Sequence, residues 1–176
     1  MLATTHYLQI EKNTNVLLEV QHNVIRRRLK IEIDRMYPHY NEIIVSLNEL
    51  NKLQITIFEY DTNNNRQKYD FIIGEDYPFK SPEIFFQNRY YFDFLRIYVF
   101  TKKEFARFKK VTGKECFCCH SITCMNNWGP ATTLTNIIEE IRHIRKMKRD
   151  IINNLLAEKI KQKYLVSDID LESWLY

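Results

Sequence analysis

Apolar residues in this chain of 176 residues repeat with a helical period near both ends and with a strand period in between. Helical spacing runs from about residue 16 to residue 36, and Pro38 is predicted to end that helix. It returns beyond about residue 137 and continues to about residue 163. The first apolar face consists of Leu18, Ile25, Leu29, Ile33 and Met36, and the second of Ile137, Ile141, Ile144, Ile151 and Leu155.

The middle of the chain predicts an antiparallel meander of four strands. Four segments rich in β-branched and aromatic residues cover residues 42–50, 52–61, 68–73 and 83–87. The stretch "DTNNNRQ", which begins at Asp61, is rich in turn-forming residues and is expected to join the second and third strands. A helix followed by antiparallel strands and then by helices is typical of the α+β class.

Three shorter features complete the expected secondary structure. Asn136 and Glu139 are spaced as a capping box at the start of the last long helix. Phe105 and Phe108 predict a short amphipathic helix between the strands and the cysteines. The final stretch "SDIDLESWLY" is expected to form a short amphipathic segment that packs on the body through Leu171, Trp174 and Leu175.

Composition and charge argue against several functional classes. The net charge is +4, and the basic clusters at 26–30, 102–110 and 142–149 lack regularly interleaved aromatics, so no nucleic acid is expected as a partner. We interpret the clusters as solvated helix faces, with an acidic protein partner as the alternative. No stretch approaches the roughly 20 apolar residues of a membrane span, and the amino terminus lacks the pattern of a secretory signal. These features predict a soluble protein of the cytoplasm or the nucleus that acts away from membranes.

All four cysteines lie in the stretch "CFCCHSITC" at residues 116–124. A disulfide framework would distribute its cysteines along the chain, so free thiols are expected. A zinc site formed by Cys116, Cys118 or Cys119, His120 and Cys124 is an alternative. However, structural zinc sites usually join two separated pairs of ligands, and adjacent cysteines point in different directions in an extended segment. No bound metal is therefore expected.

Two motifs carry a resemblance to a known family. The segment "DYPFKSPEIFF" at 76–86 is similar to the Tyr-Pro-Phe-x-x-Pro segment of ubiquitin-conjugating enzymes, and it follows three predicted strands as theirs does. The segment "WGPATTLTNIIEEI" at 128–141 aligns without a gap with their Trp-Ser-Pro-Ala segment and the helix after it. Trp128, Pro130 and Ala131 match outright. The chain thus resembles a divergent member of the ubiquitin-conjugating enzyme (UBC) family.

The resemblance implies a fold and an activity. It implies a UBC-like domain over residues 16–145, preceded by an extension at 1–15 and followed by a helical extension at 146–176 packed on the same domain. The family carries ubiquitin, or a ubiquitin-like protein, as a thioester on a cysteine and transfers it to a lysine. The implied partners are that cargo protein, an activating enzyme and a ubiquitin ligase. ATP is consumed by the activating enzyme, so this chain needs no cofactor of its own.

The resemblance also ranks the cysteines as nucleophiles. The family's nucleophile stands eight residues before the tryptophan, where this chain has His120. Choosing Cys119 requires one inserted residue before Trp128 and aligns Ser121 and Ile122 with the family's Ser-Ile. Cys118 and Cys116 require two and four inserted residues and are the alternates. Cys124 is interpreted as structural or incidental.

One catalytic motif of the family is missing. Its His-Pro-Asn, which supplies the asparagine that stabilises the oxyanion, would fall near "YFDF" at 91–94. Asn127 or Asn126 could supply a substitute amide donor, and both could instead form hydrogen bonds within a turn. His120 is interpreted as a polar loop residue, with an acid–base role as the alternative.

The family resemblance further implies partner contacts on the opening helix and on the two proline-containing loops. The residues implied in these contacts are Arg26, Arg27, Arg28, Phe79 and Pro130. Phe79 and Pro130 could alternatively pack the two loops against each other. Loss of His-Pro-Asn leaves a second functional hypothesis, a catalytically inactive UBC-like module that binds ubiquitin or another partner. A small zinc-binding protein is the third.

Overall fold

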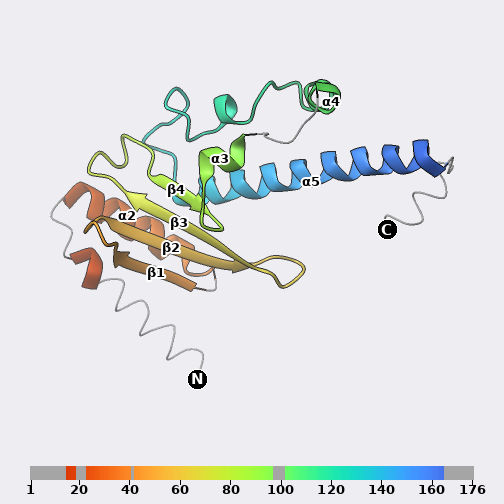
Figure 1. Cartoon of the computed structure of the whole chain (residues 1–176). Helices are drawn as coiled ribbons and strands as arrows, with labels where there is room; N and C mark the ends of the chain where they lie inside the picture. The colour runs from red at the N-terminus through yellow and green to blue at the C-terminus, as the bar shows by residue number, and fades with distance from the viewer. Residues whose placement is uncertain (1–14, 19–22, 41, 97–101, 165–176) are drawn as a thin grey trace.

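The computed structural model describes residues 15–18, 23–40, 42–96 and 102–164 (Figure 1). These residues form an α+β fold with a five-stranded antiparallel sheet in the order β1-β2-β3-β4-β5. The strands are β1 (Glu42–Leu47), β2 (Leu53–Tyr60), β3 (Arg66–Ile73), β4 (Glu83–Phe86) and β5 (Arg89–Tyr90). The helices are α2 (Asn23–Met36), α3 (Tyr91–Leu95), α4 (Lys102–Thr112) and α5 (Leu134–Tyr164), with a 3-10 turn, η1, at Cys118–His120.

The predicted four-stranded meander is therefore wrong by one short strand. Strands β1 to β4 lie where the sequence placed them, and β5 pairs with β4 through Phe86 and Arg89. The connecting residues Gln87 and Asn88 both have positive φ, at 52° and 61°. This is the backbone of a two-residue type I′ hairpin, which is usually marked in a sequence by Asn-Gly or Asp-Gly. Gln-Asn gives a much weaker signal.

The loops after β1 and β2 share one hydrogen-bonding pattern. In the loop after β1, the side chain of Asn48 accepts the main-chain N–H groups of Leu50 and Lys52 at 3.0 and 2.9 Å. In the loop after β2, Asp61 accepts those of Asn63 and Asn65 at 3.0 and 2.9 Å. These short-range bonds, led by that from Asn65, lower the pKa of Asp61. Both loops are thus closed by a side chain at their first position.

The opening helical face is confirmed in α2, where Ile25, Leu29, Ile33 and Met36 are buried and the helix ends before Pro38. Leu18 was placed on the same face, and this is wrong. Its side chain is 61% exposed, whereas the neighbouring Leu17 is buried. α2 begins only at Asn23, so helical spacing counted back from α2 does not give the orientation of the turn at 15–18.

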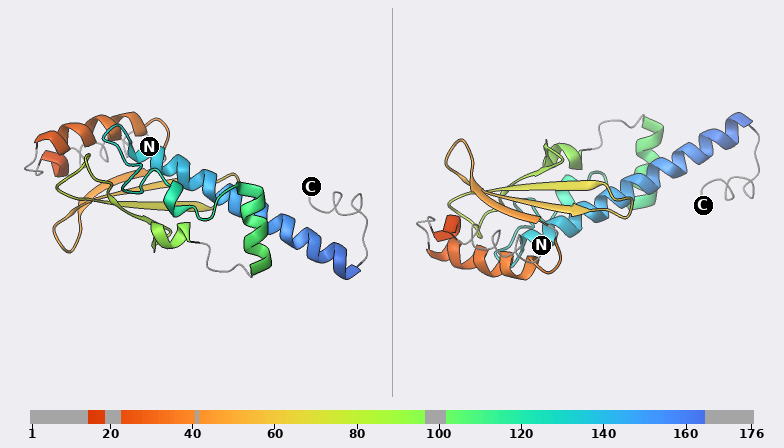
Figure 2. Two further views of the ribbon diagram at one scale, coloured as in Figure 1. Left: turned by 90° about the horizontal axis from the view of Figure 1, so that it is seen from above. Right: turned by 90° about the horizontal axis from the view of Figure 1, so that it is seen from below.

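The hydrophobic core lies between one face of the sheet and the two long helices. Alternate residues of the strands are buried, as in Ile43 and Val45 of β1 or Phe71 and Ile73 of β3. They pack in one cluster with the buried face of α2 and with the first half of α5. Figures 1 and 2 show that the second half of α5 projects past the sheet. The apolar residues that α5 gives to the core are Leu134, Ile137, Ile138, Ile141, Ile144 and Ile151.

The start of α5 has a capping box one turn earlier than predicted. The Thr133 side chain accepts the N–H of Asn136 at 3.2 Å, and the Asn136 side chain accepts the N–H of Thr133 at 2.9 Å. Asn136 is therefore the third residue of the helix and not its cap, and Glu139 has no part in the box. The predicted register was wrong because Thr133 offers the same cap chemistry three residues upstream.

The predicted extension at 146–176 begins inside α5, which runs without a break through that boundary to Tyr164. The segment with Leu171, Trp174 and Leu175 lies outside the described residues, as do residues 1–14 of the predicted extension at 1–15. Packing of that tail on the body stays a prediction. Among the helices that the structure describes, none combines the length and apolar character that a bilayer crossing requires.

The basic cluster at 142–149 is not simply solvated. Arg142 pairs with Glu59 of β2, and Arg145 lies 3.2 Å from the Asp61 carboxylate in the loop after β2. Lys148 donates to the main-chain oxygen of Phe94, and burial lowers the pKa of Lys148 to about 8. The acidic partner of these arginines is thus found within the chain, in the hairpin of β2 and β3.

A buried carboxylate joins three parts of the fold. Glu32 of α2 is 4% exposed and accepts a hydrogen bond from Arg28, one turn earlier, at 2.5 Å. It also accepts the hydroxyl of Tyr77 at 2.5 Å and the N–H of Leu134, the first residue of α5, at 2.8 Å. Burial, together with the Glu32 charge, raises the pKa of Tyr77, which therefore remains a donor. The carboxylate also lies at the positive end of the α5 dipole.

Replacing Glu32 by Ala should lower the free energy of unfolding by about 3 kcal/mol, because Tyr77 and the Leu134 N–H lose their buried acceptor. Urea unfolding followed by circular dichroism measures this. The matched control is Asp34→Ala, which removes an exposed pair with Lys30, also one turn earlier on α2. That change should cost no more than about 0.5 kcal/mol. Equal losses in the two variants would contradict the junction role of Glu32.

Candidate functional site

The cysteine segment, residues 116–124, follows α4 and is attached to the core through the side chain of Phe117. α4 ends at Thr112 and is followed by Gly113, whose φ of 67° suits glycine and whose N–H donates to the main-chain oxygen of Lys109 at 2.8 Å. Phe117 is buried and meets Phe108 of α4 edge to face, with ring centroids 5.1 Å apart. The predicted amphipathic helix around Phe105 and Phe108 is confirmed, with Phe108 on its buried side.

Three cysteine sulfurs on residues near Phe117 lie close together. The Sγ atoms of Cys116, Cys118 and Cys119 all lie within 4.8 Å of one another, and we call them the thiol trio. Cys118 Sγ is 3.2 Å from Cys116 Sγ and 3.9 Å from Cys119 Sγ. Residues 118–120 form the 3-10 turn η1, and this turn brings the neighbouring sulfurs onto one side. The premise that Cys118 and Cys119 must point apart is therefore wrong, because their segment is not extended.

The zinc ligand set considered from the sequence is only partly assembled. Cys116, Cys118 and Cys119 converge, but the ring nitrogens of His120 and the sulfur of Cys124 lie outside the group whose ligand atoms are within 4.8 Å. Cys124 instead uses its main-chain oxygen to accept the N–H groups of Asn127 and Trp128 at 2.8 and 2.9 Å. His120 is exposed at the end of η1.

Two members of the thiol trio differ in pKa. The main-chain N–H of Cys119 points at Cys116 Sγ at 3.4 Å, and this bond leads the effects that lower the pKa of Cys116 below its ordinary 9.0. Hydrogen bonding with Cys116, and then with Cys118, raises the pKa of Cys119 to about 12. The half-buried Cys116 therefore loses its proton more readily than the exposed Cys119.

Glu140 of α5 anchors the segment just beyond the thiol trio. Its carboxylate accepts the main-chain N–H of Ile122 at 2.9 Å and the hydroxyl of Ser121 at 2.8 Å. It also accepts the hydroxyl of Tyr91, on α3, at 2.8 Å. Ser121 is fully buried and in turn contacts Thr123 Oγ1 at 2.7 Å. Because α5 belongs to the core, Glu140 holds the backbone that follows Cys119 in a fixed position.

The side-chain amide of Asn127 holds the same stretch of backbone. Its side-chain amide donates to the main-chain oxygens of Cys119 and Ser121, at 3.0 and 2.9 Å. Both hydrogens of the amide are thus used within the loop in this conformation. Asn126 is exposed next to it. Of the two roles considered for Asn127, this arrangement favours hydrogen bonding within the turn over donation to an oxyanion, and these bonds hold the backbone of Cys119.

The two motif segments of the sequence lie side by side. The indole N–H of Trp128 donates to the main-chain oxygen of Pro78 at 2.8 Å, and the Trp128 and Tyr77 rings are 6.4 Å apart. Phe79 is 70% exposed and Pro130 is exposed too, so neither serves to pack the loops together. Both remain accessible to a partner.

The three arginines of α2 have different surroundings. Arg27 is exposed, and Arg26 is half-buried and donates to Asn23 at 2.7 Å. Arg28 donates to Glu32 and also to the main-chain oxygen of Thr132 at 3.1 Å. Arg28 therefore ties α2 to the residues before α5, which leaves Arg27 as the most accessible of the three.

The segment at 91–94, near which the family resemblance would place a His-Pro-Asn motif, is helical. Residues 91–94 are part of α3, and Tyr91 of that helix is fully buried against the core. Burial, reinforced by the Glu140 charge, raises the pKa of Tyr91, so its hydroxyl remains a donor to Glu140. The region supplies a support for the cysteine segment in place of an asparagine side chain.

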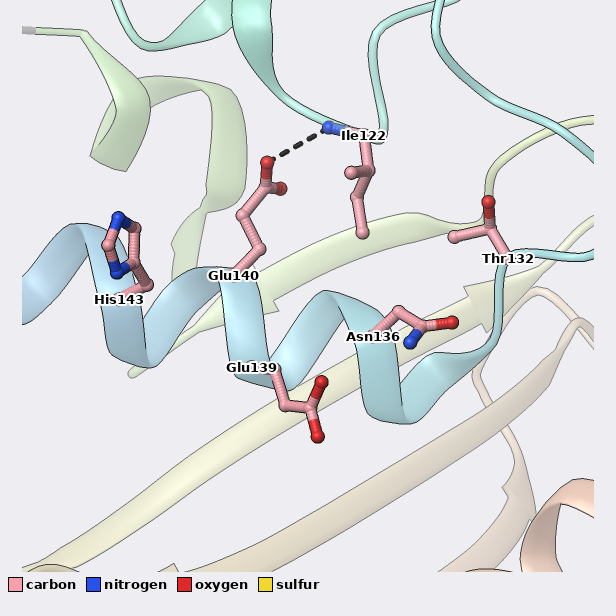
Figure 3. Close-up of a pocket in the computed structure, with 6 residues that line it drawn as sticks. All are labelled: Ile122, Thr132, Asn136, Glu139, Glu140 and His143. Carbon is pink, nitrogen blue, oxygen red and sulfur yellow. Dashed lines mark hydrogen bonds between the residues drawn. The ribbon is translucent and has the colours of Figure 1, made fainter.

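A surface depression of about 430 Å³ adjoins the same segment (Figure 3). It lies between α5 and the loop at Ile122, and Figure 3 shows Glu139 and His143 leaving the helix in different directions. Its lining residues are Ile122, Thr132, Asn136, Glu139, Glu140 and His143. Since Glu140 is already engaged and the other polar side chains do not converge, the thiol trio is the stronger candidate for chemistry.

Sequence reasoning missed the residues that position the site. Glu32, Glu140 and Tyr91 were not singled out, although each holds a functional segment. A signal existed for Glu140, because it is a carboxylate within the apolar repeat of Ile137, Ile138 and Ile141. Such a residue in the first turns of a core helix is worth examining for a buried partner.

Comparisons of the chain with protein-family models, with curated proteins and with solved structures find no match.

Alkylation should distinguish thiolate character from exposure. At about pH 8, iodoacetamide should modify Cys116 before the more exposed Cys119, because only the thiolate reacts. In Cys116→Ser, which removes the main cause of the raised Cys119 pKa, modification of Cys119 should become at least about tenfold faster. Tandem mass spectrometry of the peptide that holds all four cysteines locates the label. Faster labelling of Cys119 in the unchanged chain would contradict this charge distribution.

Proposed function

We propose that this chain is a ubiquitin-conjugating enzyme-like transferase, which carries ubiquitin or a ubiquitin-like protein as a thioester on Cys119 and passes it to a lysine. The observation that carries the proposal is the bond between Trp128 and Pro78. It joins the two segments that resemble the family, and the cysteine segment lies directly before Trp128. Cys119 is the exposed member of the thiol trio, as a residue that receives a protein cargo must be.

The proposed reaction has two steps. In the first, Cys119 Sγ attacks the thioester carbonyl carbon of the charged activating enzyme, whose own cysteine leaves as a thiolate. The Sγ of Cys116, once it has lost its own proton to solvent, accepts the proton of Cys119. In the second step a lysine amine attacks the new thioester, the Cys119 thiolate leaves, and the amine proton is lost to solvent. The cargo ends in an amide bond to the lysine.

The rest of the site supports this chemistry by position. Glu140 holds the backbone just after the turn that carries Cys119, and Asn127 holds the main-chain oxygen of Cys119 itself. The position of the sulfur is therefore largely set before the attack. The proposed contacts with the activating enzyme and a ligase would use three exposed residues, Arg27, Phe79 and Pro130. The proposed place of action is the cytoplasm or the nucleus. ATP is used by the activating enzyme only.

One observation favours the inactive-module hypothesis as the second candidate. The family's oxyanion asparagine is absent, and the nearby Asn127 amide already serves two main-chain oxygens. A module of this kind would keep the partner surface around Phe79 and Pro130 and would not form a thioester. The charging experiment separates the two hypotheses.

Incubation with activating enzyme, ATP and ubiquitin should give an adduct that a thiol reductant cleaves. Cys119→Ser should convert it to an oxyester that survives reductant, because an alkoxide leaves less readily than a thiolate. Cys118→Ser and Cys124→Ser should still form the thioester, and in Cys116→Ser the adduct should remain on Cys119. A thioester on another cysteine would contradict the choice of nucleophile. Absence of any adduct with matched activating enzymes and ubiquitin-like proteins would support the inactive module.

Asn127→Ala tests positioning against oxyanion stabilisation. If Asn127 positions Cys119, charging and discharge to free lysine should slow together, by up to about 10²-fold. The exposed neighbour Asn126→Ala is the matched control and should change neither rate. Loss confined to discharge, of about 10²–10³-fold, would instead identify Asn127 as the oxyanion donor.

A further inference from the structure

We propose that the thiol trio of Cys116, Cys118 and Cys119 is a binding site for a thiophilic divalent cation, zinc in the first instance, with three thiolate ligands and one coordination position left open. The sequence had predicted free thiols, because neighbouring cysteines do not share a face in an extended segment. The η1 turn removes that objection.

The sulfur positions suit the cation. A tetrahedral zinc ion with Zn–S bonds of about 2.3 Å separates its sulfurs by roughly 3.8 Å. The Cys118–Cys119 separation is 3.9 Å, the Cys118–Cys116 separation is 3.2 Å, and every pair lies within 4.8 Å. The separations of 3.2 and 3.9 Å thus differ from the value for a tetrahedral ion by about 0.6 Å or less. Convergence of three soft ligands on one point selects a soft or borderline cation such as zinc over magnesium or calcium.

The surrounding structure holds the ligands in place. Phe117 is buried against Phe108, so the chain on either side of it is fixed to the core. The N–H of Cys119 points at Cys116 Sγ at 3.4 Å, which is a contact to a ligand atom of the kind that orients metal-binding side chains. Asn127 holds the main-chain oxygen of Cys119 at 3.0 Å.

The ligand count predicts an accessible ion. Cys124 and His120 lie outside the group, so the chain offers three convergent sulfurs among its described residues. Three protein ligands with an open position are characteristic of zinc sites that exchange their fourth ligand, whereas structural sites are closed by four. Cys119 is exposed, and the open position therefore faces solvent or an incoming group.

Binding has a consequence that rests on the proposed function. Each thiol that binds zinc releases its proton, and the lone pair of Cys119 is then committed to the ion. Zinc occupancy and thioester formation on Cys119 should consequently exclude each other. The cation would act as a reversible block of charging.

The first measurement tests the site without ubiquitin. The full chain, reduced with a phosphine, is titrated with Co²⁺, a probe for zinc sites. One equivalent should produce thiolate-to-cobalt charge-transfer absorption, which one equivalent of Zn²⁺ abolishes. Cys118→Ser and Cys116→Ser should weaken binding beyond the about 10- to 100-fold typical for loss of an outer-shell partner. Cys124→Ser is the matched control and should bind as the unchanged chain does. Circular dichroism confirms that each variant is folded.

Absence of the absorption in the unchanged chain, or equal binding by Cys118→Ser and Cys124→Ser, would overturn the site.

The second measurement is charging with and without added Zn²⁺. Zinc should inhibit the unchanged chain and Cys124→Ser, and a chelator should restore both, whereas Cys118→Ser should charge and resist zinc. Zinc inhibition that is equal in the unchanged chain and in both variants would show an effect on the activating enzyme and would overturn the block. If the chain does not charge at all, the proposed function fails, and the cobalt titration still decides the site.

Discussion

The arrangement of this protein depends on one buried carboxylate. Glu32 accepts donors from its own helix, from the loop at Tyr77 and from the first turn of α5. Burying a carboxylate is unfavourable unless it is paired and hydrogen-bonded, so the three donors must be in place together. That requirement sets the loop at Tyr77 and the start of α5 relative to α2. The bond from Trp128 to Pro78 then follows, because Trp128 and Leu134 belong to one short stretch of chain.

Glu140 repeats the arrangement closer to the thiol trio. It too gathers donors from three places, namely α3, the Ser121 hydroxyl and a main-chain N–H. The two carboxylates are linked through α5, since Glu32 fixes its first residue and Glu140 lies fewer than two turns later. The cysteine segment is long and contains little regular structure, so its position cannot come from a ladder of backbone hydrogen bonds. It comes from these side-chain acceptors on core helices.

Much of the fold could be predicted because it depends on local period. The α+β class, strands β1 to β4 and the long helices follow from apolar spacing and from breakers such as Pro38. What failed depends on geometry that spacing does not encode. The β5 strand requires a type I′ turn at Gln87 and Asn88, and the α5 cap required a choice between two capping residues. The convergence of the cysteines depends on a 3-10 turn, which no periodic pattern marks.

The thiol trio constrains its own chemistry. Three sulfurs so close together cannot easily carry three negative charges, because like charges oppose ionisation of their neighbours. Cys116, whose ionised form a main-chain N–H favours, is therefore the first to lose its proton, and the exposed thiol of Cys119 loses its proton later. A protonated thiol is a poor nucleophile and is also poorly reactive toward oxidants. Cys119 loses its proton most readily when that proton moves onto a neighbouring sulfur or when a bound cation offsets the added charge. The first route leaves the sulfur free to accept an acyl group, and the second occupies it. The same crowding that makes Cys119 slow to ionise therefore makes the trio a better site for a cation than any one of its cysteines alone.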